Sequence, residues 1–247
     1  MAIDSIDYKE KDIKYNISLN NEQKLSKGII LENKVAFITG AGGSSKTLLA
    51  CQIALDSFFK KTIKKIVITR PLVTAGENLG YLPGGIDEKT DPFLQAIYQN
   101  FYMLYKKEKI KSMIEEGVIE VVPFAFMRGL TYQDTIVIAD EIQNTTVAQC
   151  KLILERLGLN SKLLLTGDIK QKDLNKSISS GIEFLEYLNG TNLPGFIKIE
   201  LLENHRDPLV EDVLDIYEEF EGKVDVNKVK ERIQSKAKRR RQRFCFQ

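Results

Sequence analysis

Short runs of aliphatic and β-branched residues alternate along this chain with longer stretches in which apolar residues recur every three or four positions. Several of the short runs are almost continuously apolar, which is typical of strands covered on both faces of a sheet. The alternation predicts an α/β fold, with a mostly parallel sheet flanked by crossover helices. The predicted strands are Val35–Thr39, Ile66–Thr69, Ile119–Val122, Thr135–Ala139, Leu163–Thr166 and Ile197–Leu201.

Helical periodicity is clearest directly after Lys46, in TLLACQIALDSFF, and three further stretches share it. Asp91 followed by Pro92 is a suitable start for one of these helices, because proline suits the first helical position. Residues 144–146, Asn-Thr-Thr, offer side-chain caps for the next helix. The three further stretches are Asp91–Leu104, Val147–Leu157 and Pro208–Phe220.

The length of 247 residues suits one large α/β domain or two small ones, and 43% hydrophobic residues supply a sizeable core. We predict one domain over residues 1–222, followed over 223–247 by a C-terminal helix, Asp225–Arg241, and a basic tail. The sequence has no apolar run of the about 18 residues that a membrane span requires, and its N-terminus lacks the apolar core of a secretory signal. Three widely spaced cysteines form no metal or disulfide framework, so we expect a cytoplasmic protein with two buried thiols and one near the tail.

Positive charge is concentrated near the C-terminus, although the formal net charge is only +2. Six basic residues stand in KAKRRRQR, residues 236–243, while the rest of the chain has 30 basic against 34 acidic residues. Such a tail attracts phosphate backbones electrostatically. A solvated, frayed chain end explains the same residues equally well, so the tail by itself leaves both interpretations open.

The segment GAGGSSKT, residues 40–47, nearly matches the phosphate-binding pattern G-x-x-x-x-G-K-[ST] and stands between a predicted strand and a predicted helix. In such a loop, backbone N–H groups and the N-terminus of the helix bind phosphate oxygens. Lys46 is then expected to contact the β- and γ-phosphates, and Thr47 to bind Mg²⁺. The predicted nucleotide-binding residues of this segment are Gly40, Ala41, Gly42, Gly43, Ser44, Ser45, Lys46, Thr47 and Leu48.

Ser45 occupies the position where the pattern has glycine. If the backbone there requires a positive φ, a non-glycine residue costs on the order of 1 kcal/mol or more. If the loop requires only a small side chain, serine costs almost nothing. The sequence does not decide between these two loops, and a chance Gly/Ser turn is the alternative to both.

Two further predicted strands end in polar residues, and the carboxyl ends of strands are where open α/β sheets bind ligands. Asp140 and Glu141 follow the strand TIVIA, where Asp140 is placed to hold Mg²⁺ and Glu141 to polarise an attacking water. Asp168 follows the strand LLLT, and Gln171 is placed to orient that water or to sense the γ-phosphate. A solvated turn is the alternative for either segment.

Several long strings of the sequence resemble PhoH-family ATPases over roughly residues 20–215. The resemblance implies a RecA-like core related to superfamily 1 helicases, with ATP and Mg²⁺ as cofactors and Glu141 as the catalytic glutamate beside Asp140. The strings are TRPLVTAGENLGYLPGGIDEKTDPFLQAIY, PFAFMRGLTYQD, IADEIQNTT, LLLTGDIKQKDL, SGIEFL and HRDPLV.

The resemblance also implies roles for single residues outside the phosphate loop. Gln23, on an expected N-terminal helix, matches a glutamine that reads the adenine edge in related helicases. Arg206, and after it Arg70, match arginines suited to stabilise transferring phosphate charge, as does Arg128. A solvated glutamine and structural salt bridges are the alternatives. The family block usually reads M-R-G-R-T, so Leu130 replaces one possible phosphate or nucleic-acid contact.

These features together predict Mg²⁺-dependent ATP binding and hydrolysis. Related helicases bind ATP between two lobes, and this chain has room for one, so we expect a head-to-tail homo-oligomer in the form of a hexameric ring. RNA or single-stranded DNA is the expected partner, and base stacking on Tyr81, Phe124 or Phe126 stands beside plain packing as the explanation of those residues. The alternative function is a nucleotide-binding assembly protein that hydrolyses ATP slowly or not at all.

Overall fold

The structure is a computed structural model that describes residues 14–71, 97–169, 171, 174, 178–220, 222, 227, 230, 231 and 235. The chain forms two compact units, Met1–Asn204 and His205–Gln247. The first unit contains the sheet and the helices that cover it, and the second contains α7 (Pro208–Phe220). The domain boundary predicted after residue 222 lies within the second unit.

A six-stranded sheet forms the centre of the first unit, with the strand order β3-β2-β4-β5-β1-β6. Every pairing between neighbouring strands is parallel, and β1 aligns Val35 with Leu163 of β5 and with Phe196 of β6. The predicted α/β class with a parallel sheet is thereby confirmed, and each predicted strand is present within one residue of its predicted ends. The strands are β1 (Val35–Gly40), β2 (Lys65–Thr69), β3 (Ile119–Val121), β4 (Thr135–Ala139), β5 (Lys162–Gly167) and β6 (Phe196–Leu201).

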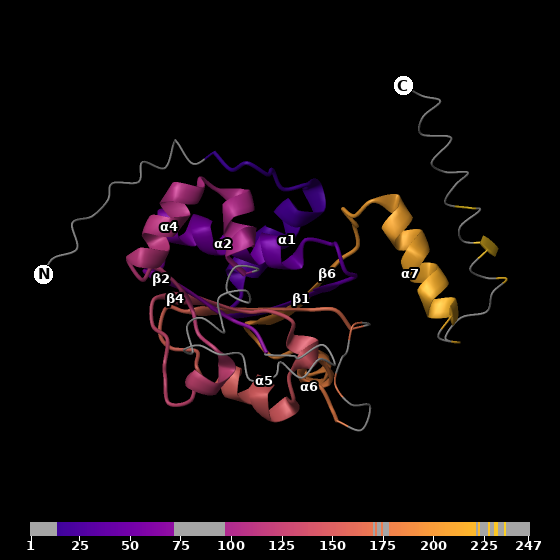
Figure 1. Cartoon of the computed structure of the whole chain (residues 1–247). Helices are drawn as coiled ribbons and strands as arrows, with labels where there is room; N and C mark the ends of the chain where they lie inside the picture. The colour runs from indigo at the N-terminus through magenta and orange to yellow at the C-terminus, as the bar shows by residue number, and fades with distance from the viewer. Residues whose placement is uncertain are drawn as a thin grey trace, which may run out of the picture. The chain divides into compact units, whose positions relative to one another are not determined.

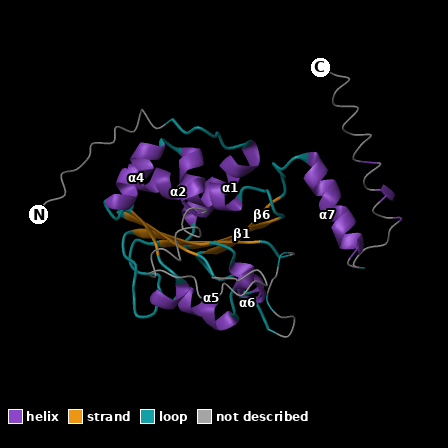
Figure 2. Cartoon of the chain, viewed as in Figure 1, coloured by secondary structure: helices purple, strands orange, loops and turns teal. Residues whose placement is uncertain are grey.

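Helices cover both faces of this sheet (Figure 1). One face carries α1 (Asn21–Glu32), α2 (Lys46–Phe59) and α4 (Lys107–Glu115), and the other carries α5 (Val147–Leu154) and α6 (Gly181–Gly190). Figure 2 shows the strands in orange between these two helical layers. Because side chains alternate along a strand, β2 directs Ile66 and Ile68 into one hydrophobic core and Val67 into the other. Two buried faces explain why the strands read as nearly continuous apolar runs.

The observed helices confirm most of the predicted ones. α2 and α7 cover the predicted stretches, and α5 begins at the predicted residue but ends at Leu154. Thr146 caps α5 as predicted, because its side chain accepts a hydrogen bond from the amide of Gln149. Of the predicted helix Asp91–Leu104, the structure describes residues 97–104, which are helical. The Asp91–Pro92 start and most of Asp225–Arg241 lie outside the described residues.

Two helices, α4 and α6, are not identified by the sequence pattern. α4 has only two buried residues, Ile110 and Met113, so its apolar repeat is short. α6 is framed by Gly181 and Gly190, which the pattern favours as turn residues. In the structure both helices are amphipathic, and they bury apolar residues three positions apart, Ile110 and Met113 in α4 and Ile182 and Leu185 in α6.

Within the described residues, no helix is long and apolar enough to cross a membrane. Cys51 and Cys150 are buried free thiols, as predicted, and Cys245 lies outside the described residues. Burial raises the pKa of Cys150 to about 12. Burial also raises the pKa of Cys51, and the negative charge of Asp140 adds to that shift. Both thiols therefore stay protonated at neutral pH and pack as small apolar groups.

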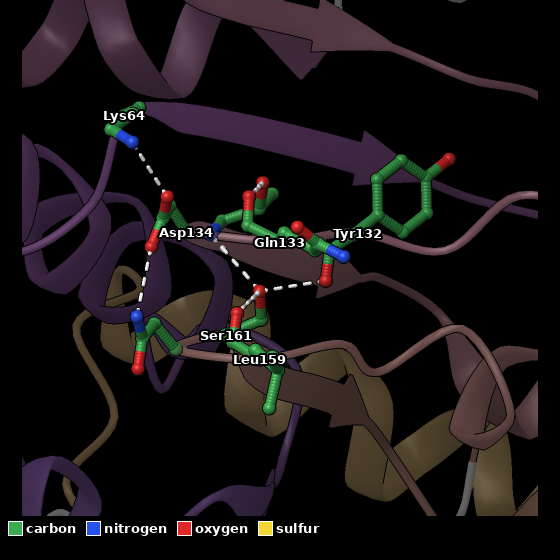
Figure 3. A network of polar contacts seen from close by, with 8 residues as sticks. Lys64, Tyr132, Gln133, Asp134, Leu159 and Ser161 are labelled. Carbon is green, nitrogen blue, oxygen red and sulfur yellow. Dashed lines mark hydrogen bonds and ion pairs between the residues drawn. The ribbon is translucent and has the colours of Figure 1, made fainter.

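The amino-terminal ends of β4 and β5 are joined by a polar network that has no counterpart among the sequence predictions (Figure 3). The ammonium group of Lys64 donates to Asp134 Oδ2 over 2.7 Å, and Asn160 donates to Asp134 Oδ1 over 3.1 Å. Ser161 Oγ accepts the amide of Thr135 over 3.1 Å and lies 2.8 Å from the carbonyl oxygen of Tyr132. These contacts fix the turns at the edge of the sheet opposite to the predicted site.

Candidate nucleotide site

The predicted site residues of β1, β2, β4 and β5 come together because all these strands point the same way. The order β2-β4-β5-β1 makes them neighbours, so their carboxyl ends form one continuous edge. The phosphate-binding loop follows β1, Arg70 follows β2, Asp140 and Glu141 follow β4, and Asp168 follows β5. The parallel topology thus assembles residues that are up to 128 positions apart in the sequence, from Gly40 to Asp168.

The loop backbone adopts conformations that favour glycine at three positions. Gly40 has φ 149°, and a Cβ atom there would lie 2.5 Å from the carbonyl oxygen of Leu201, so only glycine fits. Gly43 has φ 92°. Ser45 has φ 62° and ψ 29°, which is the left-handed region. The alternatives for Ser45 are thereby decided, because the serine adopts the glycine-like backbone and carries its strain.

The N-terminus of α2 is open towards this loop. Ser45 is the N-cap residue, but its side chain caps none of the first amides of α2, all of which the structure describes. By contrast, α1 and α5 both begin with complete capping boxes. The first amides of a helix have no intrahelical acceptor, and an uncapped helix N-terminus is a favourable place for an anion.

The loop holds two further polar groups suited to a phosphate. The Nζ atom of Lys46 donates to the carbonyl oxygens of Gly40 and Ala41 over 2.8 and 3.0 Å. Ser44 is buried, and its Oγ atom has no hydrogen-bond partner within the described part of the chain. A buried hydroxyl without a partner is costly, and a phosphate oxygen would satisfy it. The loop therefore fits a polyphosphate.

Oxygen atoms suited to a hard cation lie directly beside the loop. Thr47 Oγ1 donates to Asp140 Oδ1 over 2.8 Å, and Thr166 Oγ1 donates to the same carboxylate oxygen. Among the residues that the structure describes, no three His, Cys, Asp or Glu side chains gather as a metal site. A hydroxyl and one carboxylate are the usual protein contribution to Mg²⁺ held with substrate phosphates. Thr47 and Asp140, the predicted Mg²⁺ ligands, therefore lie together, and their role as metal ligands stays a prediction.

The carboxylate of Glu141 is engaged on both sides. Oε1 accepts from Nη2 of Arg70 over 3.2 Å, and Oε2 accepts from Nε2 of Gln143. Oε1 of Gln143 in turn accepts the amide of Asp168 over 3.1 Å. Gln143 is buried with 1% exposure and was not among the predicted site residues. Its only signal is its place in the string IADEIQNTT, because strand periodicity does not show where the turn after β4 directs a side chain.

The chain matches the sequence profile of the PhoH-like protein family over residues 17–218. The chain belongs to the PhoH-like protein family. It is 41% identical over 187 residues to the PhoH-like protein of Bacillus subtilis, and 40% identical over 194 residues to that of Synechocystis sp.. These alignments cover 75% and 78% of this chain, and each covers 59% of the relative. This PhoH-like chain therefore spans well under two thirds of those relatives.

Similar solved structures are distant in sequence. Pif1 helicase from Candida albicans aligns with a TM-score of 0.45 and 18% identity, over 82% of this chain and 44% of that one. The Sulfolobus solfataricus SWI2/SNF2 ATPase core in complex with dsDNA aligns with a TM-score of 0.45 and 14% identity, over 75% of this chain and 45% of that one.

The other predicted site residues of the PhoH-like chain differ from one another in burial and in hydrogen-bond partners. Gln23 is buried at the start of α1, where its Oε1 accepts the Asn20 amide and its own amide donates to Asn20 Oδ1. Leu48 lies in the first turn of α2. Gln171 is exposed, and its amide donates to the carbonyl oxygen of Asp168 over 3.2 Å. Arg206 is exposed in the second unit. The functional roles of these residues stay predictions.

The aromatic side chains considered for base stacking differ in exposure. Phe124 is 8% exposed and packs in the core on the α5 and α6 face, which favours plain packing. Phe126 is 60% exposed and, with the 42% exposed Leu130, lines a groove of about 480 Å³. Arg128 lies between them and is exposed. Tyr81 lies outside the described residues.

Replacing Ser45 with glycine is expected to raise the free energy of unfolding by about 1 kcal/mol, because glycine removes the cost of the left-handed backbone. Denaturant titration measures this change. Ser45→Ala is the matched control, since it removes the same hydroxyl and keeps the Cβ atom. Because that hydroxyl makes no capping bond, the alanine variant should unfold like the parent. Equal stabilisation of both variants would show that the hydroxyl, and not the backbone, is responsible.

Proposed function

We propose that this chain binds ATP with Mg²⁺ and hydrolyses it. The observation that carries the proposal is the meeting of three features at one sheet edge. These features are the open loop before α2, the oxygen pair of Thr47 and Asp140, and the carboxylate of Glu141. An anion site, a cation site and an acid–base group at one edge of a sheet are the parts that phosphoryl transfer requires.

Each residue has a defined task under this proposal. The amides of the loop and Lys46 bind phosphate oxygens, and Lys46 exchanges its two loop carbonyls for them. Thr47 and Asp140 hold Mg²⁺, which when bound neutralises charge on the phosphates. Glu141 orients the attacking water and accepts a proton from it. Gln171 and Arg206 are proposed to act near the γ-phosphate, and Gln23 at the adenine.

We further propose that a neighbouring copy completes the site in a head-to-tail ring, with six subunits, and that the ATP cycle acts on RNA or single-stranded DNA. In the described part of the first unit, the loop lies at the carboxyl edge of a single sheet. Phe126 supports the nucleic-acid part, because an exposed ring beside a groove is suited to stack on a base. The basic segment KAKRRRQR would add electrostatic attraction.

Phosphate release tests the proposal on a sample whose oligomeric state is measured by light scattering with ATP and Mg²⁺. We expect turnover that requires Mg²⁺, rises with subunit concentration as rings form, and increases when RNA or single-stranded DNA is added. A monomer that hydrolyses ATP at a concentration-independent specific rate would contradict the ring. Turnover that ignores both nucleic acids would contradict the coupling, while leaving the ATPase assignment in place.

The second candidate function is a nucleotide-binding assembly protein with little or no turnover. The strained Ser45 favours it, because the phosphate loop departs from the usual glycine at that position. ATP would then stabilise contacts between subunits. Assembly that depends on ATP, in a parent protein that releases no phosphate, would support this candidate over the first.

A further inference from the structure

We propose that Gln143 is the positioning residue of Glu141 and that Arg70 is its exchangeable counter-ion, released when a triphosphate competes for the guanidinium group. This inference rests on the proposed ATPase function. It concerns what keeps the reactive carboxylate in place and what occupies it before the nucleotide arrives.

The backbone at Glu141 requires such support. Glu141 has φ 55° and ψ 43°, a left-handed conformation in a residue that is not glycine. This conformation is unfavourable for any residue other than glycine and persists only where its surroundings enforce it. The 3-10 turn η2 (Ile142–Asn144) begins directly after Glu141, and the amide of Asn144 donates to the Glu141 carbonyl oxygen over 3.0 Å. The turn places the side-chain amide of Gln143 next to the carboxylate of Glu141.

Gln143 is fixed at both ends of its amide group. Its Nε2 donates to Glu141 Oε2, and its Oε1 accepts the Asp168 amide over 3.1 Å. A Cβ atom on Gly167 would lie 3.1 Å from Gln143 Oε1, so the strand end of β5 packs closely against this side chain. With 1% exposure, Gln143 has little freedom to turn away. One buried side chain therefore ties the orientation of Glu141 to the backbone after β5.

The contact between Arg70 and Glu141 is of a different kind from the hydrogen bond between Gln143 and Glu141. The ion pair is a single contact of 3.2 Å, and both side chains are 32% exposed. An ion pair that is partly open to solvent and joined by one hydrogen bond contributes little free energy, so it exchanges readily. A terminal phosphate carries more charge than a carboxylate, and its oxygens can accept hydrogen bonds from two guanidinium nitrogens at once. It is therefore the stronger partner of Arg70. Release of Arg70 frees Glu141 Oε1 for a water while Gln143 still holds Oε2.

Substitution of Gln143 is therefore expected to change kcat, and substitution of Arg70 to change the affinity for a triphosphate. Gln143→Glu keeps an acceptor for the Asp168 amide but replaces the donor to Glu141 with a like charge. We expect kcat to fall by about 10–100-fold, as for supporting residues of other active sites, while KM changes less than about twofold. Gln143→Ala is the second variant and should show the same split. Gln149→Ala is the matched control, because Gln149 serves only the cap of α5 in the described contacts and should leave kcat unchanged.

Arg70→Ala tests the exchange by nucleotide affinity. We expect the Kd of a non-hydrolysable ATP analogue to rise by about 10-fold or more, with little change in the Kd of ADP, and Arg70→Lys to recover part of the difference. Equal effects on both nucleotides, or none, would overturn the exchange. A kcat within about twofold of the parent in both Gln143 variants would overturn the positioning role.

Failure of the proposed function and failure of the roles proposed for Gln143 and Arg70 would give different experimental results. If the parent releases no phosphate, the ATPase assignment fails, and the binding measurements still decide the role of Arg70. In that case hydrogen exchange decides the role of Gln143. The Asp168 amide should exchange faster in Gln143→Ala than in Gln143→Glu, because only the glutamate keeps an acceptor. Equal protection of this amide in both variants would overturn the tie between Gln143 and the backbone after β5.

Discussion

Replacing Glu141 with glutamine is expected to lower ATP turnover by about 10²–10⁴-fold, the range for loss of a general base. The amide cannot accept a proton from water, but it keeps the length of the side chain, and its one oxygen can still accept a hydrogen bond from either Arg70 or Gln143. Nucleotide affinity should therefore stay within a few-fold of the parent. Steady-state phosphate release and equilibrium binding of a fluorescent ATP analogue measure the two quantities separately.

Glu120→Gln is the matched control for this experiment. Glu120 lies on β3 and pairs with Lys65 over 2.5 Å, outside the candidate nucleotide site, so loss of its charge should leave turnover without nucleic acid unchanged. The control is measured without nucleic acid because Glu120 also lines the groove beside Phe126. Persistent turnover in Glu141→Gln would show that another group activates the water. Absence of turnover in the parent, with ATP-dependent assembly retained, would instead establish the assembly protein.

Replacing Lys46 with alanine is expected to weaken ATP binding by about 10–100-fold, because hydrogen bonds to charged groups are each worth 1.5–3 kcal/mol. Lys46 is held over the loop by the carbonyl oxygens of Gly40 and Ala41, so its ammonium group is already placed for a phosphate. The thermal shift caused by a fixed ATP concentration measures this loss, since a ligand stabilises the folded state by RT ln(1 + [L]/Kd), where [L] is the concentration of free ligand.

Lys64→Ala is the control for Lys46. Lys64 pairs with Asp134 at the opposite edge of the sheet, and its side chain is 82% exposed. Its removal takes away the same charge without touching the loop, so the ATP-induced shift should match that of the parent. A similar loss in both variants would mean that Lys46 acts only through the net charge of the protein.

Local patterns were sufficient for the framework of this fold. The strand runs predicted the strand ends to within one residue, because strands buried on both faces must be apolar along their whole length. The loop before α2 and the carboxylates after β4 were recognisable because each motif lies within a few consecutive residues. Helices α4 and α6 were less visible, since each is short and α6 begins and ends with a glycine, although both bury an apolar repeat.

The environment of individual site residues could not be derived from local patterns. Gln143 is two positions from Glu141 in the sequence, yet its role depends on the course of η2 and on the approach of Asp168 from another strand. The Arg70–Glu141 pair likewise joins residues 71 positions apart. Such contacts follow from strand order and register, which single-segment periodicity does not contain.

The sequence by itself determined which strands exist, that they run in parallel, and that a phosphate-binding loop and an acidic pair stand at their carboxyl ends. Apolar periodicity and short motifs are local properties, so the chain displays them directly. Only the tertiary structure decided that Ser45 takes the left-handed backbone and that Glu141 is held by Gln143 and Arg70. Torsion angles and long-range contacts depend on how neighbouring strands pack, because each loop takes the conformation that its surroundings enforce.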